Sequence, residues 1–583
     1  MIFVKTLFSN FRHEIGVFIL ILLVTGCQSF GRTLNTNEGA SERNNILKHH
    51  VVMFDKDGYA VDPTGNQECQ PRKNNEDPAY CDGKHSVMTN YPRFNRNDFT
   101  KHVSNIIKSA KMHAIDKKKV QVLFFVHGGL NTQVGSLEHI VGEEPDSKQK
   151  KPTLYKMIMK ETKYYPIFIN WQSSLRSSYF DHLLYVRQGE KWPMLAGWLT
   201  APVVLAADIG RSILRAPLVW GSMIYNDTKT APVLTGLLGN EKNLPDEVVK
   251  ELLCHDAQDQ KSCSTRFDSN KAYSTFSKAC WNGTENLKQA SVGNQIIVGV
   301  DERRCPEMGW KFFQWLVTIP TKLVISPFLD AFGKSAWDNM LRSIQLLYQV
   351  DKEFHVDSPA NMHPAKLSNR NPGGGLSIFF DELVKEIYKQ EESNNNGNAE
   401  KKDWEITWVG HSAGTIIINE AIRRFGLPKT QDQVLPFNAI VYMAAASTLH
   451  DVQASVYPYL QNHQSTHFYH LMLHEKAEEG ETVWQPFDLP PRGSLLVWID
   501  DFLSNPLTHK ERTAGKYQNF FRDYHSIPKN IRDQIHLRVF SQGKIVRSGN
   551  PQKHGEFTDR FRFWDAKCWT TDFSQTKNDC VFP

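Results

Sequence analysis

The stretch ITWVGHSAGTIII, from Ile406 to Ile418, joins an apolar strand-like run to a helix-like run through the five residues from Gly410 to Gly414. These five residues have the pattern G-x-S-x-G, centred on Ser412. A serine on a sharp strand-to-helix turn exposes its hydroxyl, and flanking glycines leave room where side chains would collide. Free N–H groups at the start of the helix favour negative charge beside the serine. The stretch therefore indicates Ser412 as a candidate nucleophile.

Strand-like and helix-like segments alternate on both sides of this turn. VQVLFFVHGGLNT (Val120 to Thr132) is a dense apolar and β-branched run ended by two glycines, which is typical of a buried parallel strand. A helix-like stretch (Leu154–Glu161) and a strand (Tyr165–Ser173) follow it. After the turn come a helix (Ala413–Phe425) and three more strands: Phe437–Ser447, His467–His474 and Ile535–Gly543. This order predicts an α/β fold with a doubly wound, mostly parallel sheet.

Gly410 to Gly414 resembles the nucleophile elbow of the α/β-hydrolase superfamily, of the serine esterase and lipase type. The earlier stretch His127-Gly128-Gly129 ends a strand and resembles the H-G-G oxyanion motif of the same enzymes. The resemblance implies that the backbone N–H groups of Gly128, Gly129 and Ala413 stabilise an oxyanion. It covers residues 120–173 and 373–564, and it implies no cofactor.

The resemblance also implies a catalytic histidine after the last strand and an acid after an earlier one. His554 lies on a turn-rich segment beyond the last strand, whereas His536 lies inside that strand. We expect Glu478 to be the acid, because it allows a short turn after the strand His467–His474. Its neighbours in that segment are Glu475, Glu479 and Glu481. The alternative acid is Asp451, one strand earlier.

The N-terminus is typical of an export signal. A basic start with Lys5 and Arg12 precedes an apolar run, residues 15–24, that is short for a membrane span. The residues from Val24 to Cys27 resemble the lipobox of bacterial lipoproteins, which implies that acyl chains such as palmitate anchor Cys27 to a membrane. Gln28 stands where the family's inner-membrane retention signal has Asp, which favours the outer membrane. The alternative is a plain secretory signal with an incidental cysteine.

The other eight cysteines favour the same oxidising compartment. They lie as four near-neighbour pairs, for which we expect local disulfides: 69–81, 254–263, 280–305 and 568–580. No pair has the C-x-x-C spacing of a zinc site, and His470 with His474 lacks a third ligand, so we expect no metal. A net charge of +5 from 68 basic and 63 acidic residues is too balanced for nucleic-acid binding.

The chain divides into five expected segments: a signal peptide (1–26), a flexible tether (27–44), the first part of the hydrolase-like core (45–174), a helical cap insertion (175–372) and the second part of the core (373–583). The insertion contains two unusually apolar stretches, Trp192 to Tyr225 and Trp310 to Phe332, each interrupted by proline and charged residues. One interpretation is an apolar cap that admits acyl chains or lies on the membrane. The other is the buried core of a helical subdomain.

Taken together, these patterns predict a membrane-anchored serine hydrolase that cleaves carboxylic esters, with lipid esters as the expected substrates. A thioesterase or peptidase on the same triad is the alternative within enzymes. A lipoprotein that uses this scaffold only for binding is the alternative outside them, since a fold does not fix a function.

Overall fold

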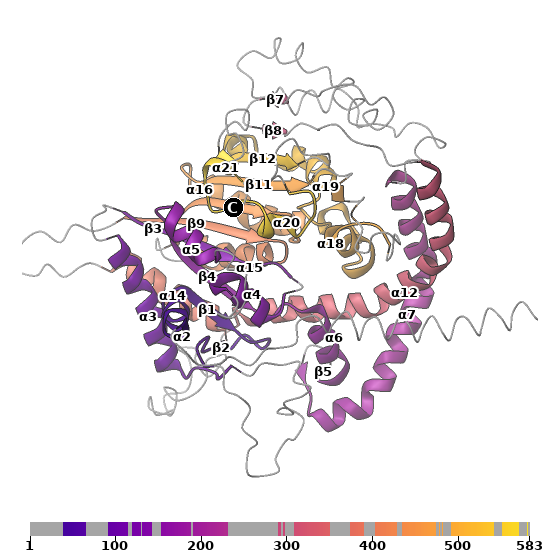
Figure 1. The fold of residues 1–583 in the computed structure, drawn as a ribbon, viewed down its shortest axis with the longest axis horizontal. Helices are drawn as coiled ribbons and strands as arrows, with labels where there is room; N and C mark the ends of the chain where they lie inside the picture. Colours follow the sequence, from indigo (N-terminus) through magenta and orange to yellow (C-terminus); the bar gives the residue numbers. More distant parts are fainter. Residues whose placement is uncertain are drawn as a thin grey trace, which may run out of the picture.

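Figure 1 shows the fold in a computed structural model of the chain. The structure describes residues 39–65, 91–114, 119–129, 131–142, 153–187, 190–230, 290–292, 295–297, 308–349, 374–389, 403–427, 434–473, 477–478, 481, 491–540, 551–570 and 580. Cys27 and six of the other eight cysteines lie outside these residues, as do Glu475, Glu479 and His474.

The centre of the molecule is a twisted sheet of mostly parallel strands. Eight strands follow one another in the order β2–β1–β4–β3–β9–β10–β11–β12, and the short strands β8 and β7 continue the sheet beyond β12. Within this sheet the β1–β2 and β7–β8 pairs are antiparallel and every other pair is parallel. The strands are β1 (Val51–Phe54), β2 (Ala60–Val61), β3 (Lys119–Val126), β4 (Tyr165–Trp171), β7 (Ala290–Val292), β8 (Gln295–Ile297), β9 (Asp403–His411), β10 (Phe437–Met443), β11 (His467–Leu473) and β12 (Ile535–Phe540).

Helices cover both faces of the sheet, which accounts for the nearly continuous apolar strands. Successive side chains on a strand point to opposite faces. On β3, Phe124 meets Phe379 and Phe380 of helix α14 (Gly375–Tyr388), whereas the next residue, Phe125, stacks on Phe563 near the C-terminus. Burial on both faces is the arrangement in which a parallel sheet is stable. The prediction of an α/β fold with a mostly parallel sheet is confirmed.

The other helices of the core lie before, between and after the strands. They are α2 (Gly39–His50), α3 (Arg96–His113), α4 (Gln133–Val141), α5 (Leu154–Glu161), α15 (Gly414–Ala421), α16 (Leu449–Asn462), α18 (Leu495–Trp498), α19 (Tyr517–Arg522), α20 (Glu556–Asp559) and α21 (Lys567–Thr570). Five-residue π-helical turns extend α15 (Ile422–Gly426) and α18 (Ile499–Leu503), and short 3₁₀ turns lie at His509–Glu511, Tyr524–Ser526 and Lys529–Gln534. Since α2 begins at Gly39, a helix occupies part of the segment that was expected to be a tether.

A helical insertion leaves the core directly after β4. It begins with α6 (Leu175–Leu184) and a small hairpin of β5 (Val186–Arg187) and β6 (Glu190–Lys191), and continues with the long helices α7 (Met194–Thr230) and α12 (Met308–Leu346). Figure 1 shows α7 and the N-terminal half of α12 together along one side of the molecule, and the C-terminal half of α12 running back to the core. Each long helix contains two prolines, Pro202 and Pro217 in α7 and Pro320 and Pro327 in α12.

Two further observations concern the predicted disulfides and membrane-spanning helices. The disulfide between Cys568 and Cys580 is present, so the local pairing predicted for these two cysteines is confirmed. Among the described residues, no helix combines the length and the apolar character needed to cross a bilayer.

Candidate functional site

The structure places Ser412 on a tight turn between β9, which ends at His411, and α15, which begins at Gly414. Its φ angle of 50° lies in the left-handed region, a strained conformation for a residue with a side chain. Two hydrogen bonds hold the turn against the end of β10: the Ser412 N–H donates to the Met443 carbonyl (2.9 Å), and the Ala446 N–H donates to the Ser412 carbonyl (3.1 Å). Strain that is maintained by the surrounding structure is typical of functional turns.

The glycines of the turn are required by close packing. A Cβ atom on Gly414 would lie 2.5 Å from the carbonyl oxygen of Val126, the last residue of β3. A Cβ atom on Gly410 would lie 2.5 Å from the side chain of Ile418. The start of α15 is therefore pressed against the end of β3, which brings the His127-Gly128-Gly129 segment to the serine.

His554 lies beside Ser412, as predicted. Its Nε2 atom is 2.9 Å from the Ser412 hydroxyl oxygen, and both residues are buried. Burial lowers the pKa of His554 well below its usual value of 6.5, so the imidazole is neutral near pH 7. A neutral imidazole beside a serine hydroxyl can accept the hydroxyl proton.

Two hydrogen bonds to the backbone fix the position of His554. Nε2 of His411 is 3.0 Å from the His554 carbonyl oxygen; because a carbonyl only accepts, this nitrogen carries the proton of the neutral His411 ring. Burial lowers the pKa of His411 to about 4, which keeps that ring neutral. The His554 N–H donates to the carboxylate of Glu481 (3.0 Å). The sequence carries no signal for this role of His411, because its partner lies 143 residues away in the chain.

The H-G-G segment packs directly on the elbow. A Cβ atom on Gly128 would lie 2.7 Å from Nδ1 of His411 and 3.0 Å from Cβ of Ser412. A Cβ atom on Gly129 would lie 3.4 Å from Cβ of Ala413 and 3.5 Å from the end of Met340 in α12. Among the hydrogen bonds between described residues, none uses the backbone N–H of Ala413. The structure thus brings the predicted oxyanion residues to one place beside the serine.

His127 holds this segment in place and takes no direct part at the serine. Its Nδ1 atom bonds the Gly128 carbonyl (2.8 Å), and its Nε2 atom accepts the N–H of Trp171 at the end of β4 (3.2 Å). The Ser173 hydroxyl donates to the same Gly128 carbonyl (3.1 Å). With its carbonyl fixed from two sides, the peptide group that follows Gly128 has a defined orientation.

Glu478, the predicted acid, is buried a short distance beyond β11. The Ser494 hydroxyl donates to its Oε2 atom, whereas its Oε1 atom has no hydrogen-bond partner among the described residues. Nδ1 of His554 is likewise buried and without a partner in the described part of the chain. Burial is the main reason that the pKa of Glu478 is raised to about 8, and the nearby charge of Glu481 acts in the same direction. Glu481 is a neighbour of both residues: it accepts the His554 N–H, and its charge acts on Glu478, whereas no hydrogen bond in the described part of the chain joins Glu478 to His554.

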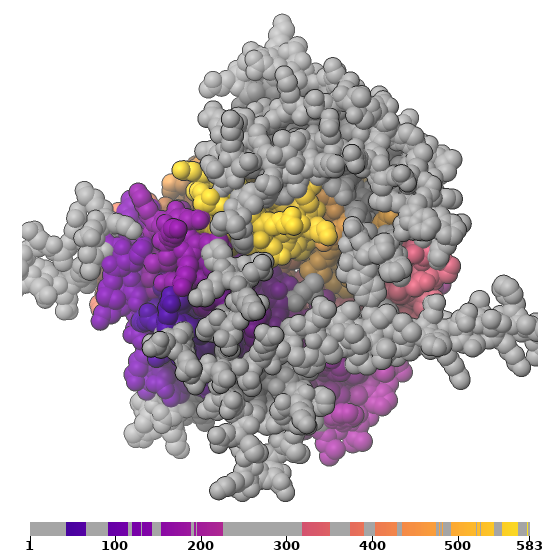
Figure 2. All heavy atoms as spheres, viewed as in Figure 1, coloured from indigo at the N-terminus to yellow at the C-terminus, as the bar shows by residue number. Residues whose placement is uncertain are grey.

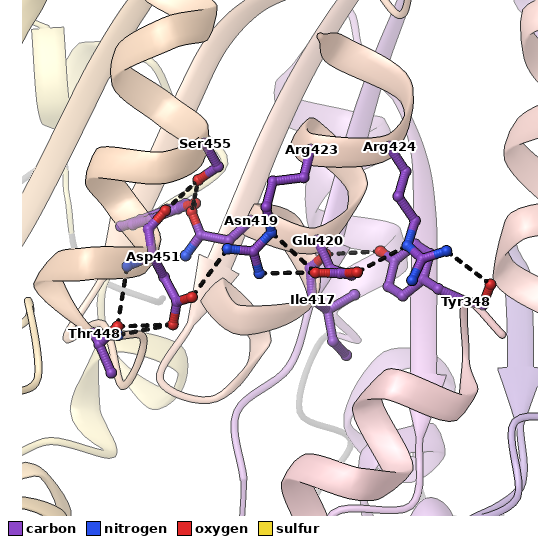
Figure 3. Close-up of polar contacts among 10 residues, drawn as sticks. Tyr348, Ile417, Asn419, Glu420, Arg423, Arg424, Thr448, Asp451 and Ser455 are labelled. Carbon is purple, nitrogen blue, oxygen red and sulfur yellow. Dashed lines mark hydrogen bonds and ion pairs between the residues drawn. The ribbon is translucent and has the colours of Figure 1, made fainter. Parts of the chain in front are cut away.

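Asp451, the alternative acid, has a different role in the structure. It is the third residue of α16, where its carboxylate and the Thr448 side chain form a capping box. Its other oxygen accepts a bond from Arg423 (3.0 Å), and Figure 3 shows the network that continues from Arg423 to Glu420 and Arg424. Both carboxylate oxygens of Asp451 thus bond to Thr448 and Arg423, and no described hydrogen bond joins Asp451 to His554.

Within the described ranges, no three histidine, cysteine, aspartate or glutamate side chains converge as ligands. His470 lies fully buried in β11 between Tyr442, Phe468 and Phe520, and burial lowers its pKa to about 3.

No protein-family model, no curated protein and no solved structure matches this chain.

Proposed function

We propose that the protein is a serine hydrolase of the α/β-hydrolase type that cleaves carboxylic esters. The observation that carries this proposal is the 2.9 Å contact between His554 Nε2 and the hydroxyl of Ser412, on a turn held at a φ of 50°. A nucleophile within hydrogen-bond reach of a base is the basic unit of covalent acyl transfer. Gly128, Gly129 and Ala413 beside the serine supply the place where negative charge can be stabilised.

The first half of the reaction forms an acyl-enzyme. Nε2 of His554 takes the proton from the Ser412 hydroxyl as its oxygen attacks the ester carbonyl carbon. The carbonyl oxygen becomes an oxyanion that accepts hydrogen bonds from the backbone N–H groups of Ala413 and the H-G-G segment. The protonated His554 then gives its proton to the leaving alcohol, and the carbon–oxygen ester bond breaks.

The second half releases the acyl group. A water molecule gives a proton to Nε2 of His554 and attacks the acyl carbon, and the same histidine returns the proton to Ser412 as the bond to serine breaks. The carboxylic acid leaves, and the enzyme regains its starting state.

Glu478 is proposed to orient His554 through its free oxygen. For Nε2 to accept a proton, Nδ1 must carry one, and that N–H needs an acceptor. Oε1 of Glu478 is an unused buried acceptor in this region. The ionised form of this carboxyl group would fix the tautomer and stabilise the imidazolium that forms during the reaction, and the positive charge on His554 would in turn favour that ionised form. Glu481, by contrast, bonds the His554 backbone and would position the loop.

Lipid esters are the proposed substrate class, and the cell envelope the proposed location. Support comes from the lipobox-like Val24 to Cys27 segment, which would anchor the chain to a membrane, with the outer membrane favoured by Gln28. Further support comes from Met340, which places an apolar side chain of the insertion beside Gly129. A thioesterase or peptidase would use the same residues in the same steps.

One observation favours a binding function instead. Ser412 is only 1% exposed and His554 only 7% exposed, so a substrate must displace part of the protein to reach them. A lipoprotein that retains this scaffold for binding would also have a closed site of this kind.

A chain-length series of p-nitrophenyl esters, from acetate through octanoate to palmitate, distinguishes these functions. The chain from Gln28 onward retains all described residues and is compared with Ser412→Ala and His554→Ala. The hydrolase proposal requires turnover that both substitutions reduce by about 10³-fold or more. Turnover that survives Ser412→Ala would contradict it.

A further inference from the structure

Helix α7 turns an unusually apolar face to solvent. Six of its large aliphatic side chains are between 64% and 84% exposed: Leu195, Leu199, Val203, Ile213, Leu214 and Leu218. Trp198 and Trp220 add exposed aromatic surface toward the two ends of the same stretch. Single exposed apolar residues are ordinary, whereas a continuous apolar face of this kind marks an interaction site.

The polar side chains of α7 point the other way. Between Leu195 and Ile224 the charged residues are Asp208, Arg211 and Arg215, and all three bond inside the insertion. Asp208 accepts the Ser335 hydroxyl (2.9 Å), Arg211 donates to the Ala331 carbonyl (3.2 Å), and Arg215 pairs with Asp330 (2.5 Å).

Uncharged polar groups follow the same pattern. The Ser212 hydroxyl donates to the Pro327 carbonyl, and the Trp220 indole N–H donates to the Leu323 carbonyl (2.7 Å). These polar groups of α7 therefore bond toward α12, and the opposite face of α7 presents hydrocarbon to solvent. A helix on the surface of a soluble domain turns its polar side chains to solvent and its apolar side chains inward. Contact with lipid favours the reverse, which is the arrangement seen in α7.

We propose that the outer face of α7 binds a lipid bilayer, lying along its surface with the leucine and valine side chains among the acyl chains. The uncharged face matches the uncharged hydrocarbon of a bilayer, and tryptophans at its two ends are suited to the boundary between hydrocarbon and water. At 1.5 Å per residue, the stretch from Leu195 to Ile224 provides a contact of about 40 Å. Figure 2 shows α7, in magenta, at the outer edge of the molecule.

The length of chain before α2 favours a bilayer as the occupant. Cys27 lies twelve positions before Gly39, where α2 begins, and a fully extended chain spans about 40 Å over that separation. An acyl group on Cys27 would therefore hold the protein within reach of the membrane, at a high local concentration for a second contact. The α7 face would then set which side of the protein faces the lipid.

The same insertion connects this face to the candidate site. Asn339 of α12 bonds the Ser178 carbonyl of α6 (2.9 Å), and Met340, the next residue, lies at Gly129 beside Ser412. Membrane binding through α7 does not depend on the hydrolase chemistry, but it would place the site next to its proposed substrates.

Vesicle flotation tests this inference without any lipid anchor. The chain from Gln28 onward is mixed with vesicles of phosphatidylethanolamine and phosphatidylglycerol, or of phosphatidylcholine alone, and centrifuged through a sucrose gradient. The test variant is Leu199→Glu with Leu214→Glu. The matched control is Leu507→Glu, because Leu507 is 85% exposed and lies outside the insertion. Thermal unfolding followed by circular dichroism confirms that each variant is folded.

The proposal requires that the wild-type chain and Leu507→Glu float with both kinds of vesicle, also at high salt, and that the double variant binds at least tenfold more weakly. Flotation only with anionic vesicles and only at low salt would assign binding to basic side chains and overturn the proposal. So would equal flotation of the double variant, or no flotation of the wild type. A wild-type dimer that the double variant converts to a monomer, without flotation, would assign the face to a second copy of the chain. Ser412→Ala should float like the wild type, so this result is separate from the hydrolase test.

Discussion

Nε2 of His554 lies 2.9 Å from the hydroxyl oxygen of Ser412, although 142 residues separate them in the chain. The contact exists because β9 and β12 are parallel strands of one sheet, with β10 and β11 between them, so the segments after their carboxyl ends meet at one edge. The His411–His554 bond ties the two segments together at the same place.

Gly128 and Gly129 should differ sharply in their tolerance of alanine. A methyl group on Gly128 would lie 2.7 Å from His411 and 3.0 Å from Ser412, so Gly128→Ala must displace the elbow or the oxyanion segment. We expect it to lower kcat/KM by about 10²-fold or more. Gly129→Ala is the control, since its methyl group meets Ala413 and Met340 at ordinary contact distances. Steady-state kinetics on a soluble ester measure both, and equal losses would contradict this account.

Glu478 and Glu481 should have separable effects on catalysis. Glu478→Gln removes the carboxylate proposed to fix the histidine tautomer, and we expect kcat to fall by about 10³- to 10⁴-fold. Glu481→Gln keeps an oxygen that can accept the His554 N–H, so we expect a loss below about tenfold. A larger loss in Glu481→Gln than in Glu478→Gln would exchange their roles.

Asp451→Asn tests the assignment of Asp451 to structure. The substitution weakens the capping box and the bond to Arg423, so the free energy of unfolding should fall by about 1 kcal/mol while kcat/KM stays within twofold of wild type. A kcat loss comparable to that of Glu478→Gln would restore Asp451 as a candidate acid.

The raised pKa of Glu478 predicts a pH dependence of stability. Its pKa is about 8 in the folded protein and 4.5 as an ordinary side chain, so between these pH values the folded state holds a proton that the unfolded state releases. Stability from this group is therefore present below pH 4.5 and is lost as the pH rises toward 8. Glu478→Gln removes the effect, so the variant should gain melting temperature relative to wild type at pH 8 and lose that gain at pH 5. If the melting temperatures of Glu478→Gln and wild type differed by the same amount at pH 5 and pH 8, the raised pKa of Glu478 would be contradicted.

His411 is expected to act by positioning His554. His411→Leu removes the donor to the His554 carbonyl, so kcat should fall by about 10- to 100-fold with little change in KM. His411→Gln carries an N–H donor that can reach a similar position and should restore most of kcat. Equal losses in both variants would show that the ring matters for packing alone.

Most of the sheet and the elbow could be predicted because their signals are local. Apolar runs that end in glycines indicate β3 and β9. The glycines at positions 410 and 414 can be recognised from the G-x-S-x-G pattern alone, and in the fold they leave room for Ile418 and for the Val126 carbonyl. The capping role of Asp451 has a local signal as well: Thr448-x-x-Asp451 before an apolar periodic run is a capping-box pattern.

Other features depend on tertiary contacts that have no sequence signal. Nothing near His411 indicates that its partner is the carbonyl of His554. The apolar stretch of α7 left two interpretations open, since periodicity identifies a face but not its surroundings. The structure shows large side chains such as Leu214 exposed and Asp208 buried, the reverse of an ordinary subdomain core.

Covalent labelling with a fluorophosphonate probe is the most direct test of the central claim, that Ser412 is a nucleophile activated by His554. The chain from Gln28 onward is labelled with and without detergent micelles, which allows for the buried position of Ser412. The account predicts labelling of the wild type, none in Ser412→Ala, and a rate reduced by about 10²-fold or more in His554→Ala. A folded wild type that remains unlabelled in both conditions, or a Ser412→Ala variant that labels like the wild type, would contradict it.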